Sequence, residues 1–261
     1  MRKVSSVSIV VPSYNERDNV KILVDKIDEA LAGIEHEILF VDDSTDDTVE
    51  KIQEIAKEKP YVRVKHRENE KGLATAVILG FSLATGDYLA CMDADLQHPP
   101  AILASMYAAL EEGADFCIPS RLIPGGDDGG LNLYRKFVSG TARKIGQVML
   151  PCLRKISDPT SGLFMFRREA IKNADLRPVG WKIMVEVLAM AKYKTITEIP
   201  YTFQQRNAGE SKLDTKVTLQ YLQQCVDLRK RAVKNPDVKV TIWTVKHTEA
   251  MTKKHCGKSE K

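Results

Sequence analysis

The ten residues CMDADLQHPP, from Cys91 to Pro100, decide the fold and the chemistry of this chain. Residues 87–92 are expected to form a hydrophobic strand, and the two prolines suit the first turn of a helix, where a missing N–H does little harm. Asp93, Asp95 and Gln97 therefore fall in the connecting loop. Carboxylate and amide oxygens are hard ligands for Mg²⁺ or Mn²⁺, and Mg²⁺ leaves its other positions to phosphates and water. The stretch predicts a divalent metal that holds a nucleotide diphosphate.

The surrounding pattern supports this interpretation, because a DAD tripeptide alone is more often a solvated turn. Strands are expected at 7–11, 37–41, 62–66, 87–92 and 115–119, and apolar residues at helical spacing mark helices at 18–31, 48–55 and 72–84. This alternation predicts a parallel sheet, in which ligands bind beyond the carboxyl ends of the strands. Polar residues stand at those ends: PSYNE at 12–16, DDS at 42–44 and DAD at 93–95.

The second half of the chain is less regular. It holds a Gly-rich loop at 125–130, a helix pattern at 133–150, a short strand at 163–166 and an amphipathic helix ending at 231. That last helix could pack on the core or lie on a membrane, and its periodicity does not separate the two. We therefore divide the chain into an α/β domain at 1–216, an amphipathic, possibly membrane-associated helix at 217–231 and a basic, weakly ordered tail at 232–261.

Length and composition set the class of protein. A chain of 261 residues with 43% hydrophobic content can bury a large core as one domain. Its five cysteines include no CxxC pair, which argues against a disulfide framework or a zinc site and favours a reducing, cytosolic environment. No apolar run approaches the ~18–20 residues of a membrane span, and the start MRKVSSVS has no signal-peptide core. We expect a soluble or peripheral protein.

Positive charge is concentrated at the end of the chain. Residues 229–261 carry ten Lys or Arg against three Asp or Glu, whereas residues 1–228 carry 29 against 32. An anionic membrane surface would attract such a segment, although a merely solvated tail is the simpler alternative. The slightly acidic body argues against nucleic acid as a partner.

Several ordered blocks resemble the inverting family 2 glycosyltransferases, which have the GT-A fold. They are VPSYNE at 11–16, FVDDS at 40–44, EKGLATAVILGF at 70–81 and MDADLQHPP at 92–100. More narrowly, the polyprenol-phosphate mannose synthases, above all the archaeal-type dolichol-phosphate mannose synthases, are similar in SR at 120–121, YRK at 134–136, DPTSGLF at 158–164, GWKIMVE at 180–186 and RNAGESKL at 206–213. The resemblance implies a single GT-A domain with a mainly parallel sheet, flanked by helices, and a Rossmann-like nucleotide-binding half.

The resemblance also implies roles for individual residues. The guanosine pocket would be lined by Pro12, Tyr14, Glu16, Val41 and Asp43. The nucleotide and its metal would be held by Asp93, Ala94 and Asp95, with Gln97 completing the metal shell. The donor diphosphate would meet Lys182, Arg206 and Lys212. Two departures from the family pattern stand out: DDSTDDT at 42–48 lacks the usual Pro-Asp, and the C-terminal region lacks the transmembrane helices of many archaeal-type members.

The expected acceptor follows from a missing base. A hydroxyl acceptor needs a carboxylate base, but the stretch where relatives carry an acidic pair reads GWKIMVE here. A phosphate monoester, with its second pKa near ~6, is already largely dianionic at neutral pH and needs only cations to position it. Arg121, Arg135 and Ser139 resemble the family's acceptor-phosphate clamp, for which the bidentate fork of arginine is suited. Glu186 is either a base or a paired structural acid, and Asp158 is interpreted as a turn residue.

The expected reaction is inverting transfer of mannose from GDP-mannose to a polyprenyl (dolichyl) phosphate, with Asp93, Asp95, Arg121 and Arg206 as catalytic residues and Mg²⁺ or Mn²⁺ as cofactor. One alternative keeps the fold but uses glucose or another nucleotide sugar. Another is a non-catalytic sugar-nucleotide-binding subunit of a membrane complex, against which the two cation clusters argue. The expected location is the cytoplasmic side of a membrane: the endoplasmic reticulum in a eukaryote, the plasma membrane in a prokaryote. A small membrane-anchoring subunit is a further candidate partner.

Overall fold

Short runs of β-branched and aromatic residues form an eight-stranded sheet in the computed structural model, which describes residues 5–130, 133–177, 180–204 and 215–257. The strands are β1 (Val7–Ser13), β2 (His36–Asp42), β3 (Val62–His66), β4 (Tyr88–Cys91), β5 (Phe116–Ser120), β6 (Phe164–Arg167), β7 (Thr195–Pro200) and β8 (Lys239–Ile242). Their order across the sheet is β3-β2-β1-β4-β6-β5-β7-β8. Neighbouring strands run parallel except β6, which is antiparallel to both β4 and β5.

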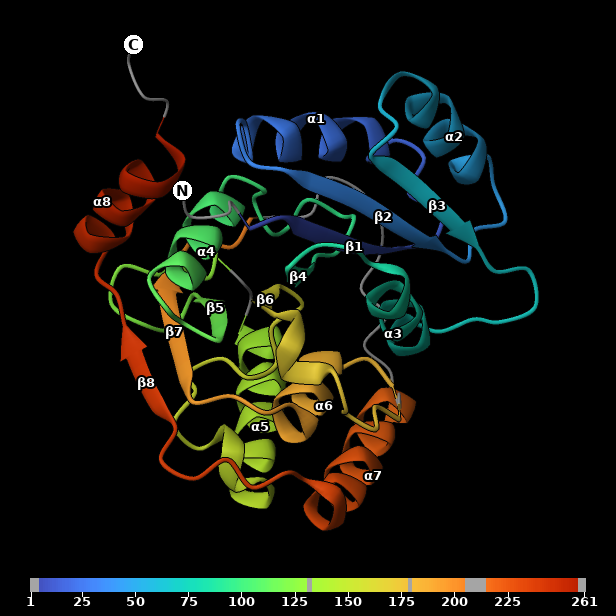
Figure 1. Cartoon of the computed structure of the whole chain (residues 1–261). Coiled ribbons are helices and arrows are strands. Elements are labelled where there is room, and N and C mark those ends of the chain that lie inside the picture. The colour runs from blue at the N-terminus through green and yellow to red at the C-terminus, as the bar shows by residue number, and fades with distance from the viewer. Residues whose placement is uncertain (1–4, 131–132, 178–179, 205–214, 258–261) are drawn as a thin grey trace.

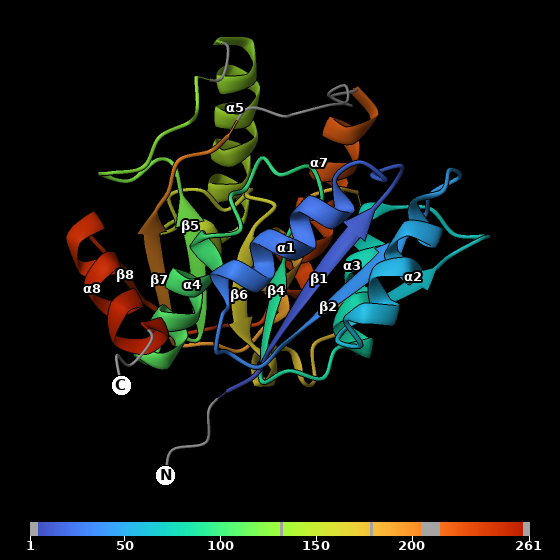
Figure 2. The same cartoon turned by 90° about the horizontal axis from the view of Figure 1, so that it is seen from above.

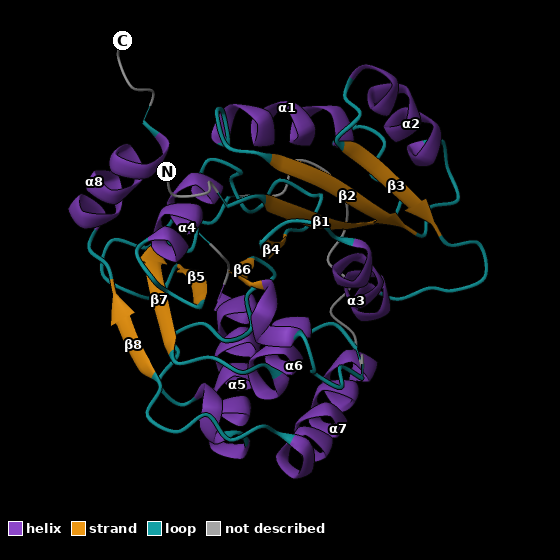
Figure 3. Cartoon of the chain, viewed as in Figure 1, coloured by secondary structure: helices purple, strands orange, loops and turns teal. Residues whose placement is uncertain are grey.

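Amphipathic and apolar helices cover both faces of this sheet (Figures 1 and 3). The helices are α1 (Val20–Ala30), α2 (Thr48–Glu58), α3 (Leu73–Leu83), α4 (Ile102–Glu111), α5 (Leu133–Met149), α6 (Ile183–Met190), α7 (Thr215–Arg231) and α8 (Val245–Cys256). The short 3₁₀ helices η1 and η2 span Pro151–Leu153 and Arg168–Ile171. One hydrophobic cluster packs α1 and α4 on one face, with α2 beside them, and a second packs α3, α6 and α7 on the other. Figure 2 shows α1, α2 and α4 in front of the strands.

The predicted mainly parallel α/β sheet is confirmed. Each strand expected from the sequence is present, with ends shifted by at most a few residues, and the expected helices in the first half are α1, α2 and α3. The sequence pattern did not predict β7, β8 or α8. It also gave no sign that β6 runs against its neighbours, because strand direction depends on tertiary pairing and not on local pattern.

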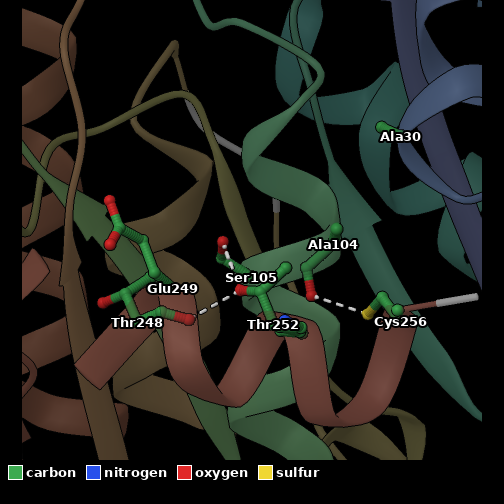
Figure 4. Close-up of a pocket in the computed structure, with 9 residues that line it drawn as sticks. Ala30, Ala104, Ser105, Thr248, Glu249, Thr252 and Cys256 are labelled. Carbon is green, nitrogen blue, oxygen red and sulfur yellow. Dashed lines mark hydrogen bonds between the residues drawn. The ribbon is translucent and has the colours of Figure 1, made fainter. Parts of the chain in front are cut away.

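The expectation of a weakly ordered tail after residue 231 is wrong for the part of the tail that the structure describes. β8 pairs in parallel with β7 at the sheet edge, and α8 packs on α4. Figure 4 shows the shallow hollow between α4 and α8, where Thr252 Oγ1 donates to Ser105 Oγ at 2.8 Å and the Cys256 thiol lies 3.3 Å from the Ala104 carbonyl oxygen. Small residues on α4 let a largely polar helix approach this closely.

Glu112, just after α4, ties the end of α8 by charge. Its Oε1 lies 2.5 Å from Lys254 Nζ and 2.6 Å from His255 Nε2. These two contacts lower the pKa of Glu112 to about 2. Part of the positive charge of the C-terminal region is therefore paired with an acidic residue of the same chain.

Helix α7 packs on the protein with one side and leaves the other side exposed. Tyr221, Cys225 and Leu228 are buried in the second hydrophobic cluster, whereas Leu219 and Val226 are exposed. Val226 directly follows the buried Cys225 in sequence but lies on the exposed side. Among the helices within the described residues, none is both long and apolar enough to cross a bilayer.

Candidate active site

A cavity of about 690 Å³ opens where strands β1 and β4 end. Such a volume lies in the range typical of ligand sites, and its position beyond the carboxyl ends of parallel strands is the expected one. Its lining includes, among others, Pro12, Tyr14, Glu16, Lys71, Asp93, Ala94, Asp95, Gln97, Gly162, Trp181 and Lys182. Eight of the residues predicted to contact the donor or metal are therefore brought together: Pro12, Tyr14, Glu16, Asp93, Ala94, Asp95, Gln97 and Lys182.

The loop after β4 presents oxygen ligands to this cavity. Asp95 is nearly buried, and its Oδ1 accepts a hydrogen bond from the Gln97 backbone N–H at 3.1 Å, which gives the loop a tight turn. Leu96, between them, has a φ of 61°, so the backbone is bent sharply at this point. The turn thus sets Asp93, Asp95 and Gln97 along one wall.

Gly162 leaves space against the Asp93 carboxylate. A Cβ built on Gly162 would lie 2.4 Å from Asp93 Oδ2, closer than real side chains allow. The cause is the antiparallel pairing of β4 with β6: Cys91 stands opposite Phe164, so two residues further along Gly162 stands opposite Asp93. A residue with a side chain at 162 would fill the space beside the carboxylate.

The residues of this wall fit a divalent metal. Two carboxylates and an amide oxygen are hard donors, the carboxylate number suits Mg²⁺ or Mn²⁺ with phosphate oxygens completing the shell, and the glycine keeps Asp93 uncrowded. Within the described part of the chain, no group of three or more His, Cys, Asp or Glu side chains is placed to bind a metal. The candidate site therefore relies on these few ligands and on what a substrate adds.

Asp43 and Val41 do not line the cavity. Asp43 accepts hydrogen bonds from Arg67 Nε and Nη2 at 2.7 and 2.6 Å, and from the Gly72 N–H at 2.9 Å. Val41 is fully buried against α3. Their predicted contact with guanosine stays a prediction, and the structure gives Asp43 a clear role in anchoring the loop that leads to α3.

Arg67 was not among the residues predicted from the sequence. Its side chain is 4% exposed and pairs bidentately with Asp43, so loss of either partner would leave a buried charge at a cost of about 3–5 kcal/mol. The anchored loop carries Lys71, whose ammonium lies 5.7 Å from the ring centroid of Tyr14 at the cavity mouth. The position of Arg67 just after β3, at the carboxyl end of a parallel strand, is the sequence signal that could have identified it.

Arg121, at the end of β5, is held on three sides. Its Nε lies 3.2 Å from Asp158 Oδ2, its Nη2 donates to Ser139 Oγ at 3.3 Å, and the guanidinium carbon stands 4.9 Å from the ring centroid of Phe203. The structure therefore brings together Arg121 and Ser139, two of the three predicted acceptor residues. The side chain of the third, Arg135 in the first turn of α5, lies outside the described part, as do Arg206 and Lys212.

Lys182 connects the cavity with this arginine. Its ammonium donates to the Thr160 carbonyl at 3.2 Å. Burial is the main cause that lowers the pKa of Lys182. The positive charge of Arg121 also lowers this pKa, whereas the negative charges of Asp158 and Asp93 oppose the shift. The Thr160 hydroxyl in turn donates to Asp158, the partner of Arg121, so hydrogen bonds and an ion pair join the cavity wall to this arginine.

His98 is buried directly after the loop of Asp93, Asp95 and Gln97. Its Nδ1 lies 3.1 Å from the Tyr201 hydroxyl, its ring stacks on Tyr201, and Phe203 meets it edge-on. Burial lowers the pKa of His98 to about 4, so it is neutral at physiological pH. A backbone hydrogen bond also joins the loop after β7 to the loop after β4, because the Gln204 N–H donates to the Gln97 carbonyl at 2.9 Å. The loop after β7 is thus fixed beside the metal loop.

Glu186 is a paired structural acid. It is fully buried on α6, where Oε1 accepts from the Arg177 backbone N–H at 2.9 Å and from Arg231 Nη2 at 3.0 Å. It does not line the cavity. Of the two alternatives drawn from the sequence, the structural one matches these contacts.

Comparison with known proteins places this geometry in a family. The family model described as glycosyl transferase family 2 matches residues 8–174, well over half of the chain. The chain belongs to glycosyl transferase family 2. The matched residues include the loop of Asp93, Asp95 and Gln97, together with Arg121 and Gly162.

Two relatives are similar over most of this chain. A dolichol-phosphate mannosyltransferase from Pyrococcus furiosus is 44% identical over 225 residues, covering 86% of this chain and 64% of the relative. A dolichol-phosphate mannosyltransferase from Saccharomyces cerevisiae is 38% identical over 253 residues, covering 91% and 93%. The chain therefore spans slightly less than two thirds of the archaeal relative and nearly all of the yeast one.

Solved structures confirm the fold expected for family 2. A glucosyl-3-phosphoglycerate synthase from Mycobacterium tuberculosis, in complex with Mn²⁺, uridine diphosphate and phosphoglyceric acid, has a TM-score of 0.64 at 20% identity, covering 88% of this chain and 80% of that chain. A mannosyl-3-phosphoglycerate synthase from Rubrobacter xylanophilus has a TM-score of 0.62 at 22% identity, covering 90% and 79%. At such identities the likeness concerns the GT-A architecture alone.

Proposed function

We propose that this chain is an inverting, metal-dependent mannosyltransferase that moves mannose from GDP-mannose to the phosphate of a polyprenyl phosphate. The observation that carries the proposal is a cavity lined by Asp93, Asp95 and Lys182, from which hydrogen bonds through Thr160 and Asp158 lead to an arginine that also contacts Ser139 and Phe203. One part suits a nucleotide diphosphate and the other a phosphate monoester. The names of the Pyrococcus and yeast relatives support the same pairing.

The donor would lie in the cavity, with its diphosphate on the Asp93–Gln97 wall. Asp93, Asp95 and Gln97 would hold Mg²⁺ or Mn²⁺, which when bound supplies positive charge for the leaving diphosphate. Lys182 lies on the same wall. Arg206 and Lys212 are proposed as further diphosphate contacts; Arg206 follows Gln204 by two residues in sequence.

The acceptor would bring its own nucleophile. A phosphate oxygen attacks C1 of the mannose, the bond from C1 to the diphosphate oxygen breaks, and its electron pair leaves with GDP, so the α-linked donor gives a β-linked product. Arg121, Arg135 and Ser139 would orient the phosphate opposite the leaving group. No proton has to be removed, because the phosphate is largely dianionic at neutral pH with a second pKa near ~6. Glu186 is paired with Arg231 and does not line the cavity, which fits an account without a carboxylate base.

The decisive experiment is GDP release from GDP-mannose with and without a polyprenyl phosphate, in Mn²⁺, in Mg²⁺ and in chelator. We expect release that needs both acceptor and metal, and a mannosylated lipid as product. GDP-glucose and UDP-glucose in the same assay separate the alternative donors. Asp95→Ala should abolish transfer while circular dichroism stays normal, because Asp95 lies in a loop. Parent-like turnover in that variant would refute the metal assignment.

The acceptor lipid requires access to a membrane, and we propose peripheral binding at a cytoplasmic face. The exposed apolar residues of two neighbouring helices support this: Phe137 and Val148 on α5, and Leu219 and Val226 on α7. The exposed Arg229 and Lys230 at the end of α7 add charge that anionic lipids attract. Flotation with anionic and with neutral vesicles tests the proposal. If no protein floats with either kind of vesicle, a separate anchoring subunit is favoured.

A further inference from the structure

Asp158 is a buried carboxylate whose contacts point to Arg121. Its side chain is 2% exposed. Oδ2 lies 3.2 Å from Arg121 Nε, and Oδ1 accepts a hydrogen bond from the Thr160 hydroxyl at 3.2 Å. Within the described residues, Oδ2 has no hydrogen-bond partner beyond this ion pair. This carboxylate is therefore enclosed, and it does not line the cavity.

The ion pair is fixed at its base as well as at its tip. Ser120 and Ser157, the residues just before Arg121 and Asp158, are joined through their hydroxyls at 2.5 Å. Ser157 also donates from its N–H and its hydroxyl to Glu198 Oε1 on β7, at 2.9 and 2.7 Å. Glu198 is fully buried. The two backbones that carry the charges are therefore tied together, so the pair cannot separate by loop movement alone.

The pair sets the direction of the guanidinium. Asp158 lies at the Nε edge of the Arg121 guanidinium and Phe203 covers one of its faces. Ser139 Oγ accepts a hydrogen bond from Nη2. A guanidinium offers five N–H donors in one plane, so fixing one edge fixes where the others point. Since Ser139 is itself a proposed acceptor residue, the side of the fork that faces Ser139 is the side left to a phosphate.

We propose that Asp158 is a positioning residue for the acceptor phosphate, acting through Arg121. The proposal rests on the proposed function, in which Arg121 grips that phosphate. It differs from a base at position 158, because the carboxylate holds a cation and takes no proton. It also differs from a turn residue, because the effect of changing it passes through one named side chain.

The test is a double-mutant cycle of Asp158→Asn with Arg121→Ala, with KM measured separately for polyprenyl phosphate and for GDP-mannose. Asp158→Asn should raise the acceptor KM roughly 10- to 100-fold, as loss of an orienting partner typically does, and leave the donor KM unchanged. In the Arg121→Ala background the same change should add nothing. An equal further loss in that background, or a matching rise in donor KM, would overturn the proposal.

Glu186→Gln is the matched control. It neutralises another fully buried carboxylate paired with an arginine, at 3.0 Å, but away from the cavity. It should lower the unfolding temperature without changing the acceptor KM. If Asp158→Asn does not fold, Asp158→Glu, which keeps the charge, replaces it: a raised acceptor KM with an unchanged donor KM supports the proposal, and an unchanged acceptor KM overturns it.

Calorimetry with farnesyl phosphate separates this inference from the proposed function. The parent should bind it, and Asp158→Asn should bind it at least tenfold more weakly. No binding by the parent would refute the phosphate acceptor and the inference together. Binding that is equal in parent and variant would leave the acceptor in place and refute only the role of Asp158.

Discussion

Replacing Gly162 with alanine tests the metal wall directly. The added Cβ would lie 2.4 Å from Asp93 Oδ2 and 3.5 Å from His98 Nε2. Ordinary contact for a Cβ begins at 3.4 Å, so the carboxylate oxygen must retreat by the difference, about 1 Å. Metal ligands tolerate deviations of only ~0.2 Å, and a misplacement of ~1 Å near the reacting groups can reduce the rate about 10²-fold.

The assay is transfer measured against Mn²⁺ concentration. Gly162→Ala should raise the Mn²⁺ concentration for half-maximal activity at least ~10-fold, since disturbed ligand geometry typically costs 10- to 100-fold in metal affinity. Gly80→Ala is the control, because its Cβ would lie 2.3 Å from Val10 Cγ1 in the core. It should destabilise the fold by about 1–3 kcal/mol without shifting the Mn²⁺ midpoint. A folded Gly162→Ala with the parent's midpoint would refute the geometry inferred for Asp93.

Three further outcomes are expected. Arg135→Ala should lose transfer yet bind GDP-mannose nearly as well as the parent in calorimetry; a collapse of donor affinity would place this arginine in the donor site. Between about pH 6 and 9, Asp158→Asn and Glu186→Gln should show no loss that recovers as pH rises, whereas a true base would give a ~10²- to 10⁴-fold loss with such recovery. Glu112 has a pKa lowered to about 2 from 4.5, so it stabilises the folded state above about pH 4.5 and that contribution is lost as pH falls toward 2. Thermal melts of Glu112→Gln should therefore show a shallower decline than the parent over that range, and parallel declines would contradict the docking of α8 through this residue.

The sequence located the carboxyl ends of the first strands, and with them Asp93, Asp95 and Gln97, because strand length and polarity are local properties. It could not locate the partner of Asp43. Arg67 lies 24 residues away, and the contact depends on the register in which β2 pairs with β3. The same holds for Gly162, whose place opposite Asp93 follows from the β4–β6 pairing.

The C-terminal elements escaped prediction for a different reason. β8 has four residues, mostly exposed, and its strand conformation comes from the free edge of β7. Helix α8 has a single buried residue, Thr248, so its sequence carries little apolar periodicity. Its position depends on hydrogen bonds and small residues on α4, which no local pattern reports. Tertiary context overrides propensity in both elements.

Because β6 runs antiparallel to β4, the pairing of these two strands determines which residue stands opposite Asp93. The loop that leaves β4 and the loop that enters β6 meet face to face, so a slip of one residue between these strands would put Ser161 or Leu163 opposite Asp93 and fill its space. The pairing continues to Tyr88 opposite Arg167 at the other end of the strands. Substitutions at those distant positions can therefore shift Gly162 relative to Asp93 by changing strand alignment, and a screen confined to cavity residues would miss them.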